Sequence, residues 1–128
     1  MSYSSPHINT MFAAARQAGK KLVRDFGEVE NLQVSIKGVS DFVSAADIQS
    51  EKILINELSR AYPDYDILAE EAGFIKNSKT NSGMKWVIDP LDGTTNFLFG
   101  IPHFAISIAL QKDGETLSGI VYNPITDD

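Results

Sequence analysis

The chain has 128 residues, a net charge of −6 at pH 7 and no cysteine, and its length suits one domain. The absence of cysteine excludes a disulfide framework and a thiolate metal site. The acidic balance argues against broad binding to the phosphate backbone of nucleic acids, so we expect no direct nucleic-acid partner.

The chain begins with MSYSSPHINTMF, which has no basic segment followed by an apolar run. We therefore expect no signal peptide. The longest apolar segment is far shorter than a membrane span, so no membrane partner is expected either. Together with the lack of cysteine, these features favour a cytoplasmic location.

Two helices and a strand are predicted in the first half of the chain. Apolar residues recur at helical spacing over residues 7–26, and Gly27 is the expected stop. Residues 31–38 are predicted to form a strand that ends at a glycine. A second helix is expected from about residue 44 to 61, before Pro63.

The second helix is expected to place Asp47 in its first turn, where the helix dipole favours a carboxylate. Its predicted core stripe consists of Ile48, Ile55 and Leu58, flanked by Leu54 and Tyr62.

The rest of the chain is predicted to be mostly strands, because short apolar runs and alternating side chains follow one another. In chain order we expect a strand over residues 66–71, a loop over 73–85, a strand over 86–89, a helical turn over 93–97, and a hairpin of strands 103–111 and 116–122. This order favours an α+β fold in which two helices pack on one face of a largely antiparallel sheet.

Four acidic residues stand out as candidates for a metal site, and three of them lie at or just past the ends of apolar strands. Carboxylates held close together repel one another, and a hard divalent cation removes that repulsion. Oxygen ligands without cysteine point to Mg²⁺ or Mn²⁺ rather than zinc. The four candidates are Asp47, Glu70, Asp89 and Asp92.

The stretch DPLDGTT, which begins at Asp89, is expected to turn the chain tightly. Both of its aspartates and the carbonyl of Leu91 between them can then face one cluster of ions. Gly93 and the threonines open a helical turn whose free N–H groups suit a phosphate. Gly93 also has no side chain to obstruct that approach.

Each candidate also has an ordinary structural interpretation. Asp92 can cap a turn, since Asp-Gly is a common turn pair, and Asp47 can simply be favoured by the helix dipole. The pair Glu70 and Glu71 can be the start of a solvated loop, and His103 fits a structural or surface histidine better than a ligand. The four acids together support a metal-assisted phosphate site better than any one of them does.

A phospho-aspartyl mechanism is not expected. The segment LDGTT resembles part of the nucleophile motif of haloacid-dehalogenase-like phosphatases. That motif requires an aspartate two residues before Asp92, and this chain has Pro90 there. The nucleophile is therefore missing.

The motif DPLDGTTNF, preceded by WVI and by AEE at residues 69–71, resembles the inositol monophosphatase family of Mg²⁺-dependent, lithium-sensitive phosphatases. GIPHFAISIAL is similar to the bacterial branch of that family. The resemblance covers nearly the whole chain and implies the N-terminal half of the sugar-phosphatase fold, a layered α+β sandwich. It also implies two or three Mg²⁺ ions, with Mn²⁺ as an alternative.

The resemblance implies metal ligands residue by residue. Glu70 would bind metal and help to orient the attacking water, and Asp89 would bridge two ions. Leu91 would contribute its backbone carbonyl to one ion, and Asp92 its carboxylate to another.

The resemblance also implies how phosphate and water are held. Gly93 and Thr94 would hold the phosphate through backbone N–H groups. The Thr94 hydroxyl, hydrogen-bonded to Asp47, would help to activate water for direct in-line attack.

One family motif, Trp-Asp-x-Ala-Ala-Gly or similar, is not reached before Asp128. Residues 1–128 are therefore expected to be the N-terminal metal- and phosphate-binding domain, with the C-terminal domain absent from this chain. The implied activity is hydrolysis of inositol monophosphate by a protein that is a homodimer when full length. Alternatives are bisphosphate nucleotidase or sugar-phosphate phosphatase activity, or an inactive half-domain that retains metal or phosphate binding or a protein-interaction role.

Overall fold

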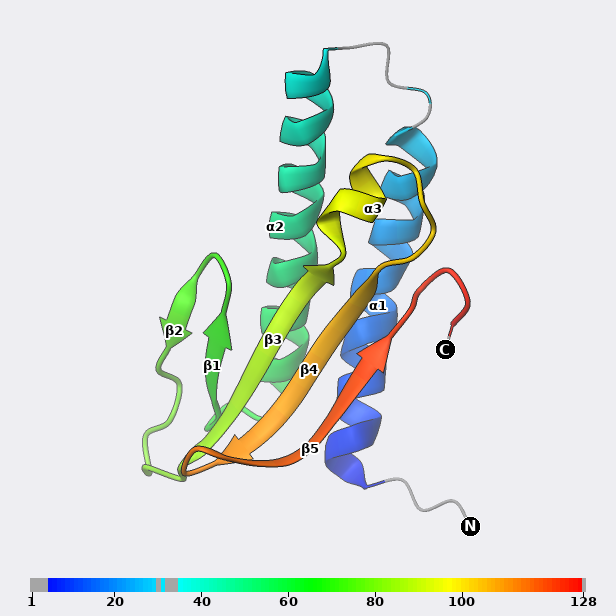
Figure 1. Ribbon diagram of the computed structural model, residues 1–128. Helices are drawn as coiled ribbons and strands as arrows, with labels where there is room; N and C mark the ends of the chain where they lie inside the picture. The colour runs from blue at the N-terminus through cyan, green and yellow to red at the C-terminus, as the bar shows by residue number, and fades with distance from the viewer. Residues whose placement is uncertain (1–4, 30, 32–34, 128) are drawn as a thin grey trace.

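Two long helices lie side by side on one face of a five-stranded sheet in the computed structural model, which describes residues 5–29, 31 and 35–127 (Figure 1). The elements are α1 (Pro6–Val29), α2 (Ile36–Ala61), β1 (Asp66–Ala69), β2 (Gly73–Ile75), β3 (Met84–Asp92), α3 (Thr94–Leu98), β4 (Ala105–Lys112) and β5 (Glu115–Tyr122). Within these described residues, no helix has the length and apolar character needed to cross a membrane.

The sheet has the strand order β2-β1-β3-β4-β5. Strands β1 and β3 are parallel, and every other neighbouring pair is antiparallel. The predicted α+β architecture, with both helices on one face of a largely antiparallel sheet, is confirmed. The parallel pair matters for the site, because its two strands end at the same edge of the sheet.

Helix α1 agrees with the prediction except at its end. Gly27 does not stop the helix, which continues to Val29. Val29 is buried in the core, so packing of the last turn offsets the weak helix propensity of glycine.

Helix α2 begins eight residues before the predicted start, at Ile36 instead of residue 44. The Ser35 hydroxyl accepts a hydrogen bond from the N–H of Gly38 at 3.2 Å and caps the helix. The predicted strand over residues 31–38 is therefore wrong at residues 35–38, Asn31 lies in a turn, and residues 32–34 fall outside the described part. The predicted end at residue 61 is confirmed.

The longer helix changes two further predictions. Asp47 lies well inside α2 and not in its first turn, so the helix dipole does not explain its position. Ile48 is 38% exposed and does not belong to the core stripe, whereas Leu54 and Leu58 are fully buried.

Strand β3 is longer than predicted and runs through Pro90 to Asp92. The expected tight turn over residues 89–92 is wrong: the pairing with β4 shifts register between Asp89 and Asp92, which marks a β-bulge. Proline is compatible with a bulge because it has no N–H to give to the ladder. The predicted loop over residues 73–85 also contains the short strand β2, which pairs with β1.

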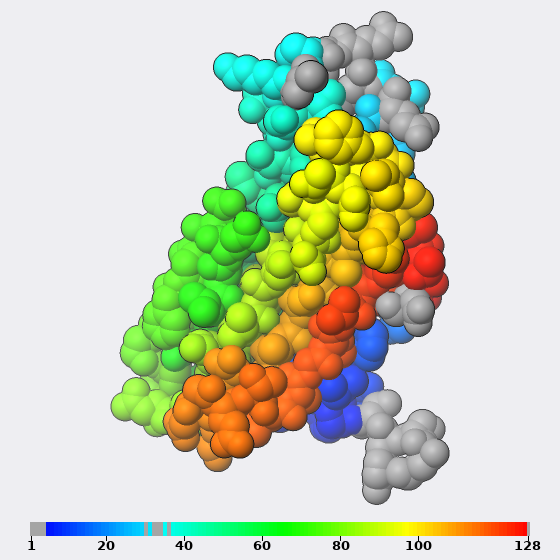
Figure 2. Space-filling view, in the orientation of Figure 1, coloured from blue at the N-terminus to red at the C-terminus, as the bar shows by residue number. Residues whose placement is uncertain are grey.

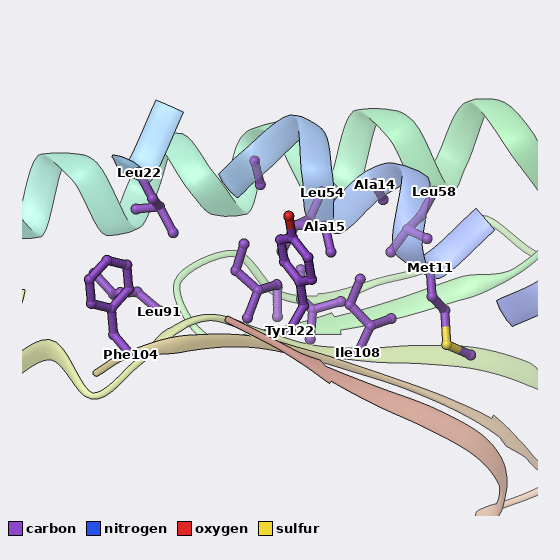
Figure 3. Close-up of a cluster of buried hydrophobic side chains, with 14 of the residues drawn as sticks. Met11, Ala14, Ala15, Leu22, Leu54, Leu58, Leu91, Phe104, Ile108 and Tyr122 are labelled. Carbon is purple, nitrogen blue, oxygen red and sulfur yellow. The ribbon is translucent and has the colours of Figure 1, made fainter. Parts of the chain in front are cut away.

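The hairpin of β4 and β5 is confirmed. Asp113 and Gly114 have φ angles of 51° and 84°, as a two-residue turn of the primed type requires. The larger side chains of β4 face the helices, and the smaller ones face away from them. The side chains on the helix side belong to a core cluster between the helices and the sheet, which includes Met11, Ala14, Ala15, Leu22, Leu54, Leu58, Leu91, Phe104, Ile108 and Tyr122 (Figure 3).

Candidate functional site

The predicted site residues gather where β1 and β3 end beside the middle of α2. The two strands are parallel, with Leu68 paired to Val87, so the chain leaves both strands at the same edge of the sheet. Helix α3 follows β3 directly at this edge (Figure 1). Asp47 on α2, Glu70 after β1 and Thr94 at the start of α3 are thereby brought to one region.

Three carboxylates form the tightest acidic group among the described residues. Asp47, Glu70 and Glu71 each offer an oxygen atom, and these atoms all lie within 4.8 Å of one another. Asp47 is buried, and both glutamates are exposed. Glu71 was considered in the sequence only as part of an acidic pair, whereas the structure places it beside the other two.

Burial, followed by the negative charges of Glu70 and Asp89, raises the pKa of the Asp47 carboxyl from 3.8 to about 7. The charges of Glu71 and Glu51 act in the same direction. Burial and the same kind of repulsion also raise the pKa of Glu70. Burial raises the pKa of Asp89 as well, and the charge of Asp92 adds to it, while the Leu91 N–H acts in the opposite direction.

This region fits a hard divalent cation. The Oδ1 atom of Asp47 is buried and has no hydrogen-bond partner among the described residues. A buried carboxylate oxygen without a donor is costly, and a cation satisfies it. The donor set consists of carboxylate oxygens, which Mg²⁺ and Mn²⁺ prefer.

A hollow of about 280 Å³ adjoins the acidic group. Its lining includes Asp47, Glu70, Thr94 and Thr95, so carboxylate-bearing and hydroxyl-bearing residues border the same hollow. Asp47 and Thr94 line this hollow without a hydrogen bond between Thr94 and the Oδ1 atom of Asp47. The arrangement can hold a cation and an oxyanion next to each other.

The remaining predicted residues do not line this hollow. Asp92 and Gly93 line a second hollow of about 390 Å³, together with His103, which is exposed as expected. Asp89 lines a shallow hollow on the sheet face that points away from the helices. Leu91 is buried in the core.

Gly93 has a structural requirement that the sequence did not reveal. Its φ angle is 91°, in the left-handed region that favours glycine. A Cβ atom there would lie 3.1 Å from the carbonyl oxygen of His103 and 3.3 Å from the Cα of Phe104. Glycine therefore allows the start of α3 to pack against the segment before β4.

Two further polar residues on α2 hold the site together and were missed in the sequence. The Ser50 hydroxyl donates to the carbonyl of Pro90 at 2.8 Å. Glu51 accepts hydrogen bonds from two backbone N–H groups just after Glu70. The signal was their spacing from Asp47, since residues three and four positions apart share one face of a helix. The spacing alone could not reveal these roles, because the contact partners of Ser50 and Glu51 lie on β3 and in the loop after β1.

The chain matches the model of the inositol monophosphatase family over residues 4–128. It is 54% identical to an inositol-1-monophosphatase of Rhizobium meliloti, over 94% of this chain and 45% of that protein. It is 44% identical to a Nus factor SuhB of Xylella fastidiosa, over 96% of this chain and 43% of that protein.

Solved structures agree with the sequence relatives. The crystal structure of the extragenic suppressor protein suhB from Bartonella henselae matches with a TM-score of 0.81 at 54% identity, covering 96% of this chain and 47% of that one. The inositol monophosphatase from Anabaena matches with a TM-score of 0.73 at 34% identity, covering 93% and 40%. The chain thus spans about half the length of the relatives it matches. On this evidence, the chain belongs to the inositol monophosphatase family.

Proposed function

We propose that this chain supplies the metal- and phosphate-binding part of a Mg²⁺-dependent phosphomonoesterase that acts on inositol monophosphate. The observation that carries the proposal is the group of three carboxylates, with oxygen atoms within 4.8 Å of one another, beside a hollow lined by threonines. Membership of the family supplies the substrate class. The proposal concerns the activity of the whole protein, because the chain spans about 45% of a relative named for this substrate.

The proposed metal ligands are the carboxylates of Glu70, Asp89 and Asp92 and the carbonyl of Leu91. When bound, Mg²⁺ or Mn²⁺ neutralises these groups, lowers the pKa of water and stabilises the leaving oxygen. The raised pKa values of Glu70 and Asp89 support the assignment, because a cation favours the ionised forms that burial and mutual repulsion disfavour.

The chain's own residues then hold and orient the reactants. Glu70 accepts a hydrogen bond from the attacking water and aims it at phosphorus. The Thr94 hydroxyl and Asp47, which line one hollow, take up the proton that the water releases. The backbone N–H groups of Gly93 and Thr94 hold the phosphate oxygens. No covalent phospho-enzyme is involved, because Pro90 occupies the position that an aspartate nucleophile needs.

The test is phosphate release from inositol monophosphate by the whole protein that contains this chain, with Mg²⁺ and after its removal by a chelator. We expect release that requires the metal, and a loss of at least about 100-fold in Asp89→Asn, because a neutral amide would replace a carboxylate proposed to hold the metal. Asp113→Asn in the β4–β5 turn makes the same chemical change far from the site and serves as the control. Equal rates of phosphate release for Asp89→Asn and the parent would contradict the assignment of Asp89 as a metal ligand.

Further properties belong to the same proposal. Lithium should inhibit the reaction, and the full-length protein should be a cytoplasmic homodimer. Release of phosphate from bisphosphate nucleotides and sugar phosphates, measured beside inositol monophosphate, tests the substrate. A higher kcat/KM on either class would replace inositol monophosphate as the preferred substrate.

A second candidate function is binding without turnover, either of metal and phosphate or of a protein partner. It is favoured by the Nus factor names of several relatives and by the half-length match. Calorimetry with Mg²⁺ and inorganic phosphate separates the two candidates when it is read beside the phosphate-release assay. Binding without release supports the second candidate, and release by the pure chain rejects it.

A further inference from the structure

Glu51 lies on α2 beneath the loop that carries Glu70 and Glu71. Its side chain is buried, with 3% of its surface exposed. Its Oε1 atom accepts a hydrogen bond from the N–H of Glu71 at 2.9 Å, and its Oε2 atom accepts one from the N–H of Ala72 at 2.9 Å. One carboxylate therefore holds two consecutive backbone donors.

The loop needs these acceptors because of its tight geometry. Ala69 pairs with Gly73 across the antiparallel strands β1 and β2, so residues 70–72 make the whole connection. Gly73 has a φ of 72°, as a sharp reversal requires. Backbone N–H groups in such a connection have no strand partner, and Glu51 supplies one for each of two.

The same contact fixes the distances within the acidic group. Asp47 and Glu51 lie one turn apart on α2, and Asp47 is the buried member of the group. Glu51 ties the loop that bears the other two members to the same helix. The separation between Asp47 and the pair Glu70 and Glu71 is therefore set by one rigid element.

A neutral acceptor would anchor the loop with less electrostatic strain. Glu51 adds a negative charge close to Asp47 and Glu70, and like charges repel one another. A carboxylate is stiff and offers two oxygens in a fixed plane, which suits the accurate placement of two donors. A bound cation offsets the added repulsion, so the negative charge of Glu51 is compatible with a metal site.

We infer that Glu51 is a positioning residue of the metal site: it holds the loop after β1 so that the Glu70 carboxylate lies beside Asp47, where a divalent cation can bind. The inference rests on the proposed function, because it assumes that the acidic group binds metal. Glu51 itself does not touch the substrate or the ion. Residues that orient metal ligands in this way typically change metal affinity by about 10–100-fold when they are replaced.

The alternative is that Glu51 serves only to anchor a loop, and the chain contains a matched case of that kind. The Oδ1 atom of Asp66, at the other end of β1, accepts hydrogen bonds from the N–H groups of Asn77 and Ser78 at 2.9 and 2.8 Å. Asp66 therefore also holds two consecutive donors of a loop, but it is not part of the acidic group. Asp66→Asn changes charge and hydrogen bonding as Glu51→Gln does.

The experiment is a titration of the 128-residue chain with Mn²⁺, followed by electron paramagnetic resonance, for the parent and for Glu51→Gln, Glu51→Asp and Asp66→Asn. Thermal unfolding of each variant is measured alongside. We expect Glu51→Gln and Glu51→Asp to weaken Mn²⁺ binding by at least about 10-fold. Glu51→Asp keeps the charge but has a side chain one methylene shorter. A loss of Mn²⁺ affinity in this variant therefore reports the changed geometry. Asp66→Asn should bind within about 2-fold of the parent, since the loop that Asp66 anchors carries none of the proposed metal ligands.

Each other outcome has a definite meaning. If the parent does not bind Mn²⁺, the proposed metal site itself is contradicted. If the parent binds and the Glu51 variants bind as tightly, the positioning role is overturned and the proposed function stands. Equal weakening in all three variants overturns it too, because the effect is then general destabilisation. The same holds if both Glu51 variants unfold while Asp66→Asn stays folded, because Glu51 then serves the fold.

Discussion

The Asp47 carboxyl lies buried within a helix and close to two other carboxylates, an arrangement that opposes its ionisation. The Oδ1 atom has no hydrogen-bond partner among the described residues. An ionised Asp47 therefore destabilises the metal-free protein, and a bound cation reverses the effect.

The first prediction concerns stability against pH. A carboxyl whose pKa is raised by folding stabilises the protein when it is protonated. That contribution is fully present below the unfolded value of 3.8 and is lost as the pH rises through the folded value of about 7. Without divalent ions, the free energy of unfolding should fall on the order of 1–2 kcal/mol from about pH 4 to pH 8, after allowance for solvent screening.

Thermal unfolding followed by circular dichroism measures this dependence. The control is Asp47→Asn, which cannot ionise and should flatten the profile, although Glu70 and Asp89 contribute in the same direction. Excess Mg²⁺ should stabilise the parent most at high pH, where the carboxylates are ionised. If the stability of the metal-free parent rose from about pH 4 to pH 8, the account of Asp47 would be contradicted.

The second prediction concerns the glycine at the start of α3. Gly93→Ala should lower the free energy of unfolding by about 1–3 kcal/mol, because alanine is strained at a φ of 91° and its Cβ meets the His103 carbonyl. Gly27→Ala is the opposite case: Gly27 lies in α1 with nothing within 4 Å of a Cβ, so it should stabilise by about 0.5–1 kcal/mol. Urea denaturation measures the change in the free energy of unfolding of each variant. A Gly93→Ala variant as stable as the parent would refute the backbone strain at Gly93.

At the scale of elements, α2 organises the site through one face. Asp47, Ser50 and Glu51 follow one another at helical spacing and reach three different places: the acidic group, strand β3 and the loop after β1. Helix α2 therefore fixes the ends of β1 and β3 relative to each other.

The third prediction tests the contact between α2 and β3. Ser50→Ala removes the buried hydrogen bond to the carbonyl of Pro90 and should lower the free energy of unfolding by about 1–2 kcal/mol. Ser59→Ala, on the same helix, removes a half-buried contact to Asn77 and should cost less than about 0.5 kcal/mol. Urea denaturation gives both values. Amide chemical shifts should change around the β3 bulge in the first variant only, and a similar change in both would refute a specific role for Ser50.

The types of most elements could be predicted from sequence, because apolar periodicity is set by the face that each element buries. The start of α2 was missed because Ser35 signals a cap only when the following residues are already assigned to a helix. The course of β3 through Pro90 was missed because bulges depend on the neighbouring strand.

The candidate residues Asp47, Glu70 and Thr94 do lie around one hollow. Their metal-binding and catalytic roles stay predictions. The sequence could not reveal Glu71 as a neighbour of Asp47, nor Glu51 as the support of its loop. Both depend on the way in which β1 and α2 pack together, which no local pattern records.

At the scale of the whole molecule, the helices cover one face of the sheet (Figure 1), and the other face is open to solvent (Figure 2). The side chains that β4 and β5 direct to this open face include small and apolar ones. Val121 and Leu117 on β5 are 69% and 54% exposed. A shallow hollow of about 350 Å³ on this face is lined by Val87, Ala109, Gly119 and their neighbours. Exposed apolar side chains that gather on one face can bind hydrophobic probes.

The fourth prediction is that the folded chain binds the dye anilinonaphthalene sulfonate on this face. Val121→Lys should reduce the fluorescence of the bound dye severalfold, because it places a charge at the hollow that Val121 lines. Val23→Lys makes the same change on an exposed position of α1 and is the control. Equal fluorescence in Val121→Lys and the parent would show that the dye binds elsewhere.

The metal site is the central claim, and anomalous diffraction from crystals of this chain soaked in Mn²⁺ tests it most directly. The account predicts an anomalous peak at the acidic group, with a carboxylate oxygen of Glu70 within coordination distance of the ion and Asp47 beside it. A well-diffracting crystal without a peak near Glu70, or with Mn²⁺ bound only at unrelated surface carboxylates, would contradict it.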